Sequence, residues 1–511
     1  MATKISTELL IMILNNVQST QDLYSSFLVN RFWCKVTVPI LWELPLGQEC
    51  CTDDKKLRKK ALCIRTYISC MNTHTRTLLT QNGLDLSSSP PQTTFDYPSF
   101  THKFIVNNLV NFISKYLPQI IDPDQDNCNI GDETYEEIVI NKSRILFSEI
   151  CKLIIDHCTY LDSFEMTGAK CFSRNFLDYG DLIGSIFKLS GASKVFKKLE
   201  SFTSTIENNE QIYPLYESLK LICDNILNMD LKLDLYFQVQ LLAELISAQK
   251  RLENLSIGAK YYQDYNSIFR AIISQKETLK CLRLNFLIFH HFERKSSPIG
   301  RFTSLQELYI EDCHGLHKWN CLSLAAAFTQ LSSFHFIYTY KGYPQKFIVK
   351  ILETANENLR NIRLSLYDTI PFDIFSAILN YCTNITELTL LNLSSEQVIA
   401  IFNNNFNELR NFSFDCGMER IDADKLLCQM AKNVPESLET IEIRMNYYNP
   451  WIFSADDLRK FFEGWCRKGR EGNKKIIVKR SEQLRRSRFK LSDEHFKVIK
   501  EYGLKSLYLM N

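Results

Sequence analysis

The sequence contains few of the residues that make a chain flexible. Among its 511 residues only 16 are glycine and 13 are proline. Long flexible linkers depend on these residues, so their scarcity argues against an extended chain. At this length we expect roughly two to four domains or one elongated array of repeats. The sequence therefore predicts a protein that is packed along its whole length.

An excess of charge of one sign is also lacking. The 60 lysines and arginines nearly balance the 58 aspartates and glutamates, so no global field attracts nucleic acid or an anionic membrane. The N-terminal apolar run from Leu9 to Leu14 is far shorter than the ~18 residues of a membrane helix. Because no signal peptide is recognisable either, we expect no membrane contact and a cytoplasmic or nuclear location, or both.

The cysteines form no pattern typical of disulfides or zinc. Their number is odd, 17, and no C-x-x-C pair occurs. A secreted disulfide framework would be denser and paired, so we expect free thiols in a reducing compartment. The nearest approach to a metal site is the group Cys313, His314, His317 and Cys321, whose spacing matches no common zinc pattern. We predict no metal and no cofactor, with zinc at this group as the alternative.

Motifs of catalysis are missing as well. The chain has no glycine-rich phosphate loop, no nucleophile elbow and no HExxH helix. Cys34 and Cys51 lack the charged surroundings that activate a cysteine nucleophile. We therefore expect a binding protein and not an enzyme.

The first 47 residues predict three short helices. Ser6 is a suitable N-cap for the first helix, whose apolar stripe consists of Leu9, Leu10, Ile13, Leu14 and Val17. The second begins at Ser19, and the third is expected from Asn30 to Val38, where Pro39 ends it. So small a group needs a partner or the rest of the chain to be stable. Taken alone, it could be a helical cap on a repeat array.

The order of residues within this segment is more specific than its helices. It runs Ile5-Ser6-x-Glu8-Leu9-Leu10-x-x-Ile13-Leu14, then Asp22-Leu23, then Leu28-Val29-Asn30-Arg31-x-Trp33, then Pro39-x-Leu41-Trp42. This order resembles the F-box motif. The family pattern begins with Leu-Pro where this chain has Ile5-Ser6, so the first helix lacks the proline that makes its start rigid.

The resemblance implies a partner and a role. An F-box binds a Skp-type adaptor, which links it to a cullin, and the corresponding adaptor-binding positions here are Ile5, Leu9, Ile13, Leu28, Val29 and Trp42. The segment Phe95–Phe100 and the layout of the chain are similar to a large fungal group of F-box proteins with degenerate repeats. The implied function is the substrate-recognition subunit of an SCF-type (Skp–cullin–F-box) ubiquitin ligase, which performs no bond-making step itself.

A leucine-rich pattern of the form L-x-x-L-x-L recurs later in the chain. Consecutive first positions from Leu252 to Leu438 lie 24 to 29 residues apart, close to the period of leucine-rich repeats. The main copies are Leu252/Leu255/Ile257, Leu279/Leu282/Leu284, Leu305/Leu308/Ile310, Leu331/Phe334/Phe336, Leu359/Ile362/Leu364, Ile385/Leu388/Leu390, Leu409/Phe412/Phe414, Leu438/Ile441/Ile443 and Leu504/Leu507/Leu509. Fainter copies are Leu161/Phe164/Met166 and Leu199/Phe202/Ser204.

Each copy predicts a short strand whose alternate residues face inward. Amphipathic helices are expected between the strands, over residues 265–275, 346–355, 372–381, 395–406 and 422–431. Stacking such units buries one continuous core. The Asn or Cys that usually follows the strand is present only as Cys313 and Asn446, so the repeats are degenerate. The strand-like blocks disfavour the competing interpretation, an array of paired helices.

We therefore predict an α/β repeat protein with three parts. Residues 1–47 form the F-box, 48–157 a helical spacer, and 158–511 a leucine-rich-repeat solenoid, or horseshoe. Within the spacer, helices are expected over 55–72, 104–116 and 135–157. Exposed strand positions should line a concave face of mixed charge, which suits a protein target; they include Ser256 and the target-binding candidates Arg283, Tyr309, His335, Arg363, Thr389, Ser413 and Glu442.

The period breaks between the copies at Leu438 and Leu504. A helix is expected from Ala455 to Trp465, followed by a basic segment over 466–490 in which Ile476–Val478 resembles a further strand. The simplest interpretation is a solvated insertion. The alternatives to a ligase subunit are a repeat scaffold without ligase coupling and binding of nucleic acid or an acidic partner through this segment. Nucleic acid is the weaker alternative, because no aromatic residues alternate with the charges.

Overall fold

The computed structural model describes most of the chain. The described residues are 5–17, 19–45, 47, 54–89, 93–120, 135–167, 180–205, 213–233, 236–259, 265–289, 302, 304–316, 328–404, 406–417, 422–445, 453–467, 474–480, 492–502 and 505–510. Two compact units divide the chain: unit 1 is Met1–Leu252 and unit 2 is Glu253–Asn511. Each unit is described by itself below.

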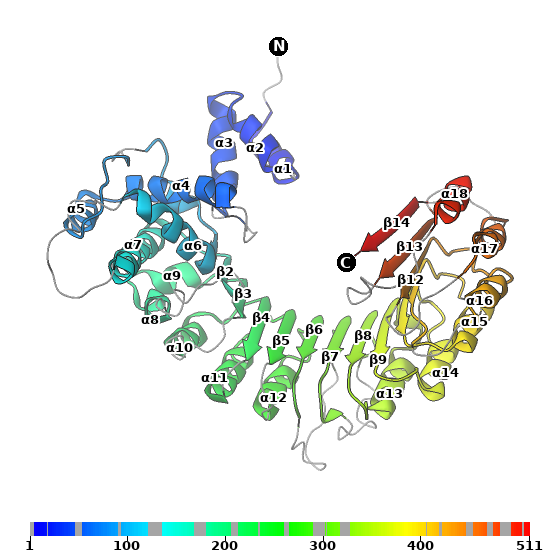
Figure 1. Ribbon diagram of the computed structural model, residues 1–511. Coiled ribbons are helices and arrows are strands. Elements are labelled where there is room, and N and C mark those ends of the chain that lie inside the picture. The colour runs from blue at the N-terminus through cyan, green and yellow to red at the C-terminus, as the bar shows by residue number, and fades with distance from the viewer. Residues whose placement is uncertain are drawn as a thin grey trace. The chain divides into compact units, whose positions relative to one another are not determined.

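Unit 1 begins with three helices, α1 (Thr7–Asn15), α2 (Thr20–Phe27) and α3 (Arg31–Trp42). Helices α1 and α2 both pack against α3 (Figure 1). The core of this helical module is small: Leu10, Leu14 and Val36 are buried, and Leu23, Trp33 and Ile40 pack around them. A side chain caps the start of each helix. The Ser6 and Ser19 hydroxyls accept hydrogen bonds from the third residue after each, and Asn30 caps α3.

The third helix does not end at Pro39 as the sequence predicts. It continues to Trp42 with Pro39 inside it, although proline in a helix interior removes one backbone hydrogen bond and costs about 3 kcal/mol. The last turn is held by the Trp42 ring, whose centroid lies 4.4 Å from that of Tyr97 and 5.8 Å from that of Tyr67. Packing between segments therefore outweighs the local preference of proline.

The rest of unit 1 alternates helices with short strands. In chain order the elements are α4 (Asp54–Cys70), α5 (Thr73–Gln81), η1 (Tyr97–Phe100), β1 (Lys103–Ile105), α6 (Val106–Tyr116), η2 (Leu117–Gln119), α7 (Tyr135–His157), β2 (Ser163–Thr167), α8 (Gly180–Ser185), η5 (Ile186–Lys188), α9 (Ala192–Phe196), β3 (Ser201–Thr205), α10 (Tyr213–Ile222), β4 (Asn228–Leu233) and α11 (Tyr236–Ser247). The strands pair in parallel in the order β1–β2–β3–β4. The helix expected from residue 104 begins at Val106, because residues 103–105 pair with β2 as a strand.

Unit 2 repeats a strand and a helix more regularly. Its elements are β5 (Asn254–Ala259), α12 (Asn266–Ser274), β6 (Cys281–Asn285), β7 (Glu307–Glu311), β8 (Ser333–Tyr338), α13 (Gln345–Ala355), η9 (Asn356–Asn358), β9 (Asn361–Leu366), α14 (Phe372–Tyr381), β10 (Glu387–Leu391), α15 (Ser395–Asn403), β11 (Asn411–Phe414), α16 (Ala423–Met430), β12 (Thr440–Met445), α17 (Ala455–Arg467), β13 (Lys475–Arg480), α18 (Asp493–Glu501) and β14 (Lys505–Met510). All neighbouring strands are parallel and follow chain order.

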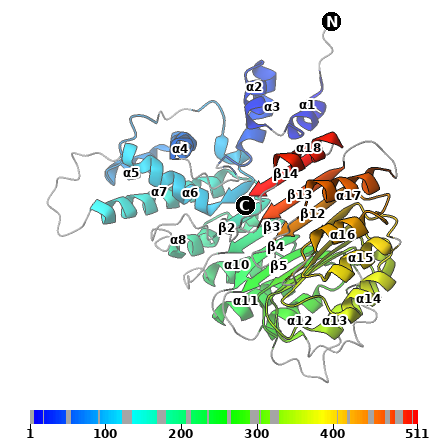
Figure 2. The same cartoon turned by 45° about the vertical axis from the view of Figure 1, so that its right-hand side comes forward.

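The sheet of unit 2 is curved, and its helices cover the convex face. Figure 1 shows β5 to β14 along an arc with α12 to α18 outside it, and the turned view of Figure 2 shows the same two layers. The opposite, concave face of the sheet carries no helices of this unit in either view. Helices followed by parallel β-α repeats of this kind define a solenoid of the leucine-rich-repeat type.

The leucine-rich pattern predicts the strands well. The last two positions of every predicted copy lie in a strand, and Ile476–Val478 lie in β13. One further copy, Ile226/Met229/Leu231, departs from the leucine-rich pattern; all three residues are buried, and the last two lie in β4. Isoleucine and methionine replace leucine there, but Ile226 lies midway between Leu199 and Leu252, where the period requires a copy.

One backbone carbonyl before each strand joins neighbouring repeats. The carbonyl of Gln306 accepts hydrogen bonds from the N–H groups of Ser332 and Ser333, at 2.8 and 3.0 Å. The same pair of bonds recurs in unit 2 at the carbonyls of Glu253, Lys280, Ser332, Arg360, Thr386 and Arg410. The repeats are thus held in register by the backbone as well as by the buried side chains.

The same pair of bonds attaches the helical module to the first strand. Directly after α3, the carbonyl of Glu43 accepts from the N–H groups of His102 and Lys103, both at 3.1 Å. The Glu43 carboxylate also lies 2.7 Å from the Lys103 ammonium. The end of α3 therefore takes the place of a preceding repeat and covers backbone groups at the edge of β1, which would otherwise be unpaired.

Candidate protein-binding surfaces

The helical module exposes an unusual number of large apolar side chains. They are between 39% and 65% exposed, and we call them the N-terminal apolar surface: Ile5, Leu9, Ile11, Met12, Ile13, Tyr24, Leu28, Val29 and Phe32. Large apolar side chains that a soluble protein leaves exposed together in one small module indicate a surface that binds a partner. Because the core of the module is so small, this surface holds more apolar side chains than the core itself.

Helix geometry explains how α1 supports both a core and a surface. At 100° per residue, Leu9, Met12 and Ile13 lie within about 100° of one another, and the buried Leu10 and Leu14 are centred about 130° further round the helix. The second apolar face is therefore not needed for packing within the module.

Five of the six predicted adaptor-binding residues lie in this surface. Ile5, Leu9, Ile13, Leu28 and Val29 are all exposed. Trp42 differs, because it is only partly exposed and its ring packs on Tyr67 and Tyr97 of the same chain. The F-box pattern does not single out the other four residues of the surface, Ile11, Met12, Tyr24 and Phe32. For Met12 the signal was present, since it lies three residues after Leu9 on the same helical face.

Ser6 provides what the missing proline would have provided. Its hydroxyl accepts a hydrogen bond from the N–H of Leu9 at 3.3 Å, which fixes the first turn of α1. The pKa of the neighbouring Glu8 is lowered by a bond from its own backbone N–H and by the Ser6 hydroxyl. A carboxylate is favourable at this end of a helix, so the start of α1 is well defined without proline.

A second candidate surface is a row of residues across the concave face of unit 2. Strand register places the predicted positions side by side, one per strand, and we call them the central row: Ser256, Arg283, Tyr309, His335, Arg363, Thr389, Ser413 and Glu442. In β6 to β10 each of these residues lies between two buried residues of its strand. The alternation of apolar residues predicts which residue of each strand lies in this row, and the binding role of the row stays a prediction.

Rings and a cation stack along the first half of the row. The Arg283 guanidinium lies 4.4 Å from the centre of the Tyr309 ring, and the His335 ring meets the same tyrosine edge-on at 4.3 Å. Glu307 accepts a 3.1 Å hydrogen bond from the Tyr309 hydroxyl and lies 4.0 Å from Arg283. Arg283 and Tyr309 are therefore fixed by contacts with each other and with Glu307.

His335 and Arg363 contain the unsatisfied groups of the row. Among the described residues, neither Nε2 of His335 nor Nε of Arg363 has a hydrogen-bond partner, although both atoms are buried. Burial and the charge of Arg363 lower the pKa of His335. Burial and the charge of Arg444 lower the pKa of Arg363. A buried polar atom without a partner costs about 1–3 kcal/mol.

The far end of the row is closed by its own hydrogen bonds. Ser413 and Glu442, which the sequence places among the exposed positions, are only 8% and 9% exposed. Arg444 covers them: its Nε donates to the Ser413 hydroxyl at 3.1 Å and to the Glu442 carboxylate at 2.6 Å. The Ser413 hydroxyl also donates to Glu442 at 3.1 Å. This cluster leaves the part of the row from Ser256 to Thr389 as the more accessible one.

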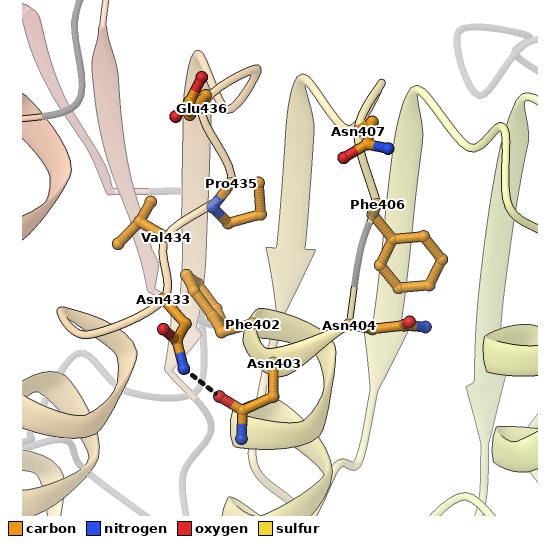
Figure 3. A pocket seen from close by; sticks show the side chains of 9 residues that line it. All are labelled: Phe402, Asn403, Asn404, Phe406, Asn407, Asn433, Val434, Pro435 and Glu436. Atoms are coloured by element: carbon orange, nitrogen blue, oxygen red, sulfur yellow. Dashed lines mark hydrogen bonds between the residues drawn. The ribbon is translucent and has the colours of Figure 1, made fainter.

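A pocket of about 500 Å³ lies elsewhere in unit 2, between the ends of neighbouring repeats. Its walls come from the end of α15, the segment before β11 and the segment after α16 (Figure 3). The Asn433 amide donates to the Asn403 side chain at 2.8 Å, and Phe402, Phe406 and Val434 are buried. The lining offers amides and one carboxylate, Glu436, but no pair of groups suited to catalysis.

The candidate zinc group is not assembled by the described residues. The Cys313 thiol donates to the carbonyl of Leu284 at 3.3 Å, and Nδ1 of His314 lies 2.8 Å from the Tyr338 hydroxyl. His317 and Cys321 lie outside the described residues, as do Asn446 and Cys51. In the described ranges no group of three or more His, Cys, Asp or Glu side chains could hold a metal ion. Cys313 thus has the repeat-turn role that the sequence predicts.

The basic segment is described only in part. Residues 474–480 are described, and residues 468–473 and 481–491 are not. Lys474 lies over the Trp465 ring, 5.5 Å from its centre, and donates to the Trp465 carbonyl at 2.5 Å. This lysine is used within the chain, and binding of nucleic acid or an acidic partner by the segment stays a prediction.

No protein-family model matches the chain, and no curated protein is significantly similar to it. The class of the molecule is therefore defined by its architecture, a β-α repeat scaffold of a type that suits protein binding. In the part of the chain that the structure describes, no helix is long and apolar enough to cross a membrane.

Proposed function

We propose that the chain is the substrate-recognition subunit of an SCF-type ubiquitin ligase. In this proposal the N-terminal apolar surface docks on a Skp-type adaptor, which links the chain to a cullin. The repeats bind a protein target, and the ubiquitin-conjugating enzyme performs the chemistry. The chain itself makes no bond; it raises the local concentration of the target near the enzyme.

The N-terminal apolar surface is the observation that carries this proposal. Protein–protein binding energy is concentrated in a few large side chains that become fully buried in the complex. The three helices present such side chains in the order typical of an F-box, and the covered edge of β1 ties them to the repeats. A repeat scaffold without ligase coupling would have no use for this second apolar face.

Binding to the adaptor tests the proposal on the full-length chain. We expect a purified Skp-type adaptor to co-purify with the chain, and Leu9→Asp and Val29→Asp each to weaken binding at least tenfold, about 1.4 kcal/mol. Leu221→Asp is the matched control, because Leu221 is 82% exposed in unit 1 outside this surface. It should leave binding unchanged.

Circular dichroism of each variant should match that of the wild type, since the substituted side chains are exposed. If the folded wild-type chain binds no adaptor at micromolar concentration, or if both aspartate variants bind as well as the wild type, ligase coupling is ruled out for this surface. The chain would then be a repeat scaffold only.

A further inference from the structure

Arg363 has an unusual position for a positive charge. It lies in the middle of the central row, between His335 on β8 and Thr389 on β10. Its Nε atom is buried without a hydrogen-bond partner, and Nε2 of His335, on the neighbouring strand, is in the same state. Both residues are partly exposed on strands whose concave face no helix of unit 2 covers (Figure 1). Arg363 thus has an unused donor there, and Nε2 of His335 becomes a second one when its ring is protonated.

Three carboxylates of nearby strands are bonded to other groups. Glu307 bonds with Tyr309, Glu387 accepts from Asn361 and Asn411, and Glu442 is held by Arg444. Glu311 and Glu442 attract Arg363, but more weakly than burial and the charge of Arg444 act against it. The described residues therefore provide no ion-pair partner for Arg363.

We propose that the middle of the central row binds an anionic side chain of the protein target, with Arg363 and His335 as its hydrogen-bond donors. A planar guanidinium suits a carboxylate or a phosphate, both of which can accept two parallel hydrogen bonds. The Tyr309 ring, held by Arg283 on the next strand, gives the neighbouring target residue a surface to pack on. The anion is an Asp or Glu carboxylate or a phosphorylated side chain.

This inference deepens the target-binding half of the proposed function, but its test needs no adaptor. The full chain is titrated into three fluorescein-labelled peptide pools, randomised except for a central Glu, phosphoserine or Gln, and binding is followed by fluorescence anisotropy. At least one anionic pool should bind tenfold more tightly than the Gln pool. Adaptor binding and peptide preference are measured separately, so either proposal can fail alone.

Substitutions locate the preference. Arg363→Gln should remove it, whereas the control Arg360→Gln should keep it, because Arg360 is paired with Glu408 at 3.5 Å and donates to the Asn384 carbonyl. Arg363→Lys keeps the charge and should retain part of the preference. Thermal unfolding of Arg363→Gln should occur no earlier than in the wild type, since no described hydrogen bond is lost.

The outcomes distinguish the sources of the anion. Tighter binding of both anionic pools means that the row accepts a carboxylate as well as a phosphate. A preference for the phosphoserine pool alone identifies phosphate as the anion, and a preference for the Glu pool alone identifies a carboxylate. The proposal is overturned if the Gln pool binds as tightly as both anionic pools, or if folded Arg363→Gln keeps the full preference for an anionic pool.

The pH provides a second measurement. His335 faces Tyr309 and Glu307 from β7 and Arg363 and Asn361 from β9, with Arg283 beyond on β6. Burial and Arg363 lower its pKa, and a bound anion acts in the opposite direction, so binding takes up a proton. Affinity for the Glu pool should therefore rise as the pH falls from 7.5 to 5.5. His335→Gln should abolish this rise, and a rise that persists in the variant excludes His335 as a donor.

Discussion

Single residues of unit 2 combine a structural role with an electrostatic cost, and Asp415 shows this clearly. Its carboxylate accepts hydrogen bonds from the N–H groups of Asn392, at 2.6 Å, and Gly417, at 3.2 Å. Burial raises the pKa of Asp415, although these bonds and the charge of Arg444 lower it. An asparagine could accept the same bonds without a buried charge.

We therefore expect Asp415→Asn to gain stability relative to the wild type as the pH rises. The pKa of Asp415 is raised in the folded chain, so the unfolded chain loses this proton first, near the ordinary pKa of 3.8. Between the unfolded and the folded pKa the folded wild type binds more protons, and its free energy of unfolding falls as the pH rises. Urea unfolding of both proteins at pH 4, 5 and 7 measures the difference. If the free energy of unfolding of the wild type instead rises relative to that of the variant with increasing pH, the folded pKa of Asp415 is lowered.

The positions of the central row could be predicted from the sequence, but the contacts of its side chains could not. Alternation within each strand predicts which residues face away from the helices. The stack of Arg283 on Tyr309 depends on the register between repeats that lie 26 residues apart. The burial of Ser413 and Glu442 depends on the rotamer of Arg444, which no local pattern specifies.

At the scale of the elements, two helices approach each other as closely as their backbones allow. A Cβ atom added to Gly464 in α17 would lie 2.2 Å from the carbonyl oxygen of Ala431, the residue after α16. Neither atom belongs to a flexible side chain, so one helix would have to move.

Gly464→Ala should therefore lower the free energy of unfolding by about 1–3 kcal/mol, although alanine is the better helix former by about 1 kcal/mol. Gly258→Ala is the control, because the nearest atom to its added Cβ is 3.9 Å away. Urea denaturation of the two variants makes the comparison. Stabilisation by Gly464→Ala would mean that α16 and α17 are not in close contact in solution.

The differences between expected and observed elements have identifiable physical causes. Helix α3 passes through Pro39 because Trp42 packs against residues that lie far along the chain. Strand β1 replaces the first turn of an expected helix because β2 pairs with it. Local patterns predict the repeated elements, whereas contacts between distant segments decide where the irregular ones begin and end.

At the scale of the whole molecule, a solenoid is stabilised by contacts between neighbouring repeats. Leu364 of β9 is fully buried in unit 2, and Leu364→Ala should cost about 2–5 kcal/mol. In hydrogen exchange followed by mass spectrometry, protection should fall most in β8 to β10 and least in β13. Ser365→Ala, at the next residue on the opposite face of the strand, is the control. An equal loss of protection throughout unit 2 would contradict stabilisation by neighbours.

Alkylation of the buried thiols reports where such a solenoid opens. Burial raises the pKa of Cys158, Cys223, Cys313 and Cys382 to about 12. Three of them donate to a carbonyl at least 27 residues earlier in the chain. Since only the thiolate reacts with alkylating reagents, each sulfur is protected while its part of the array stays closed. The rates at which the individual cysteines are alkylated therefore order the segments of this chain by their opening free energy, with no added probe.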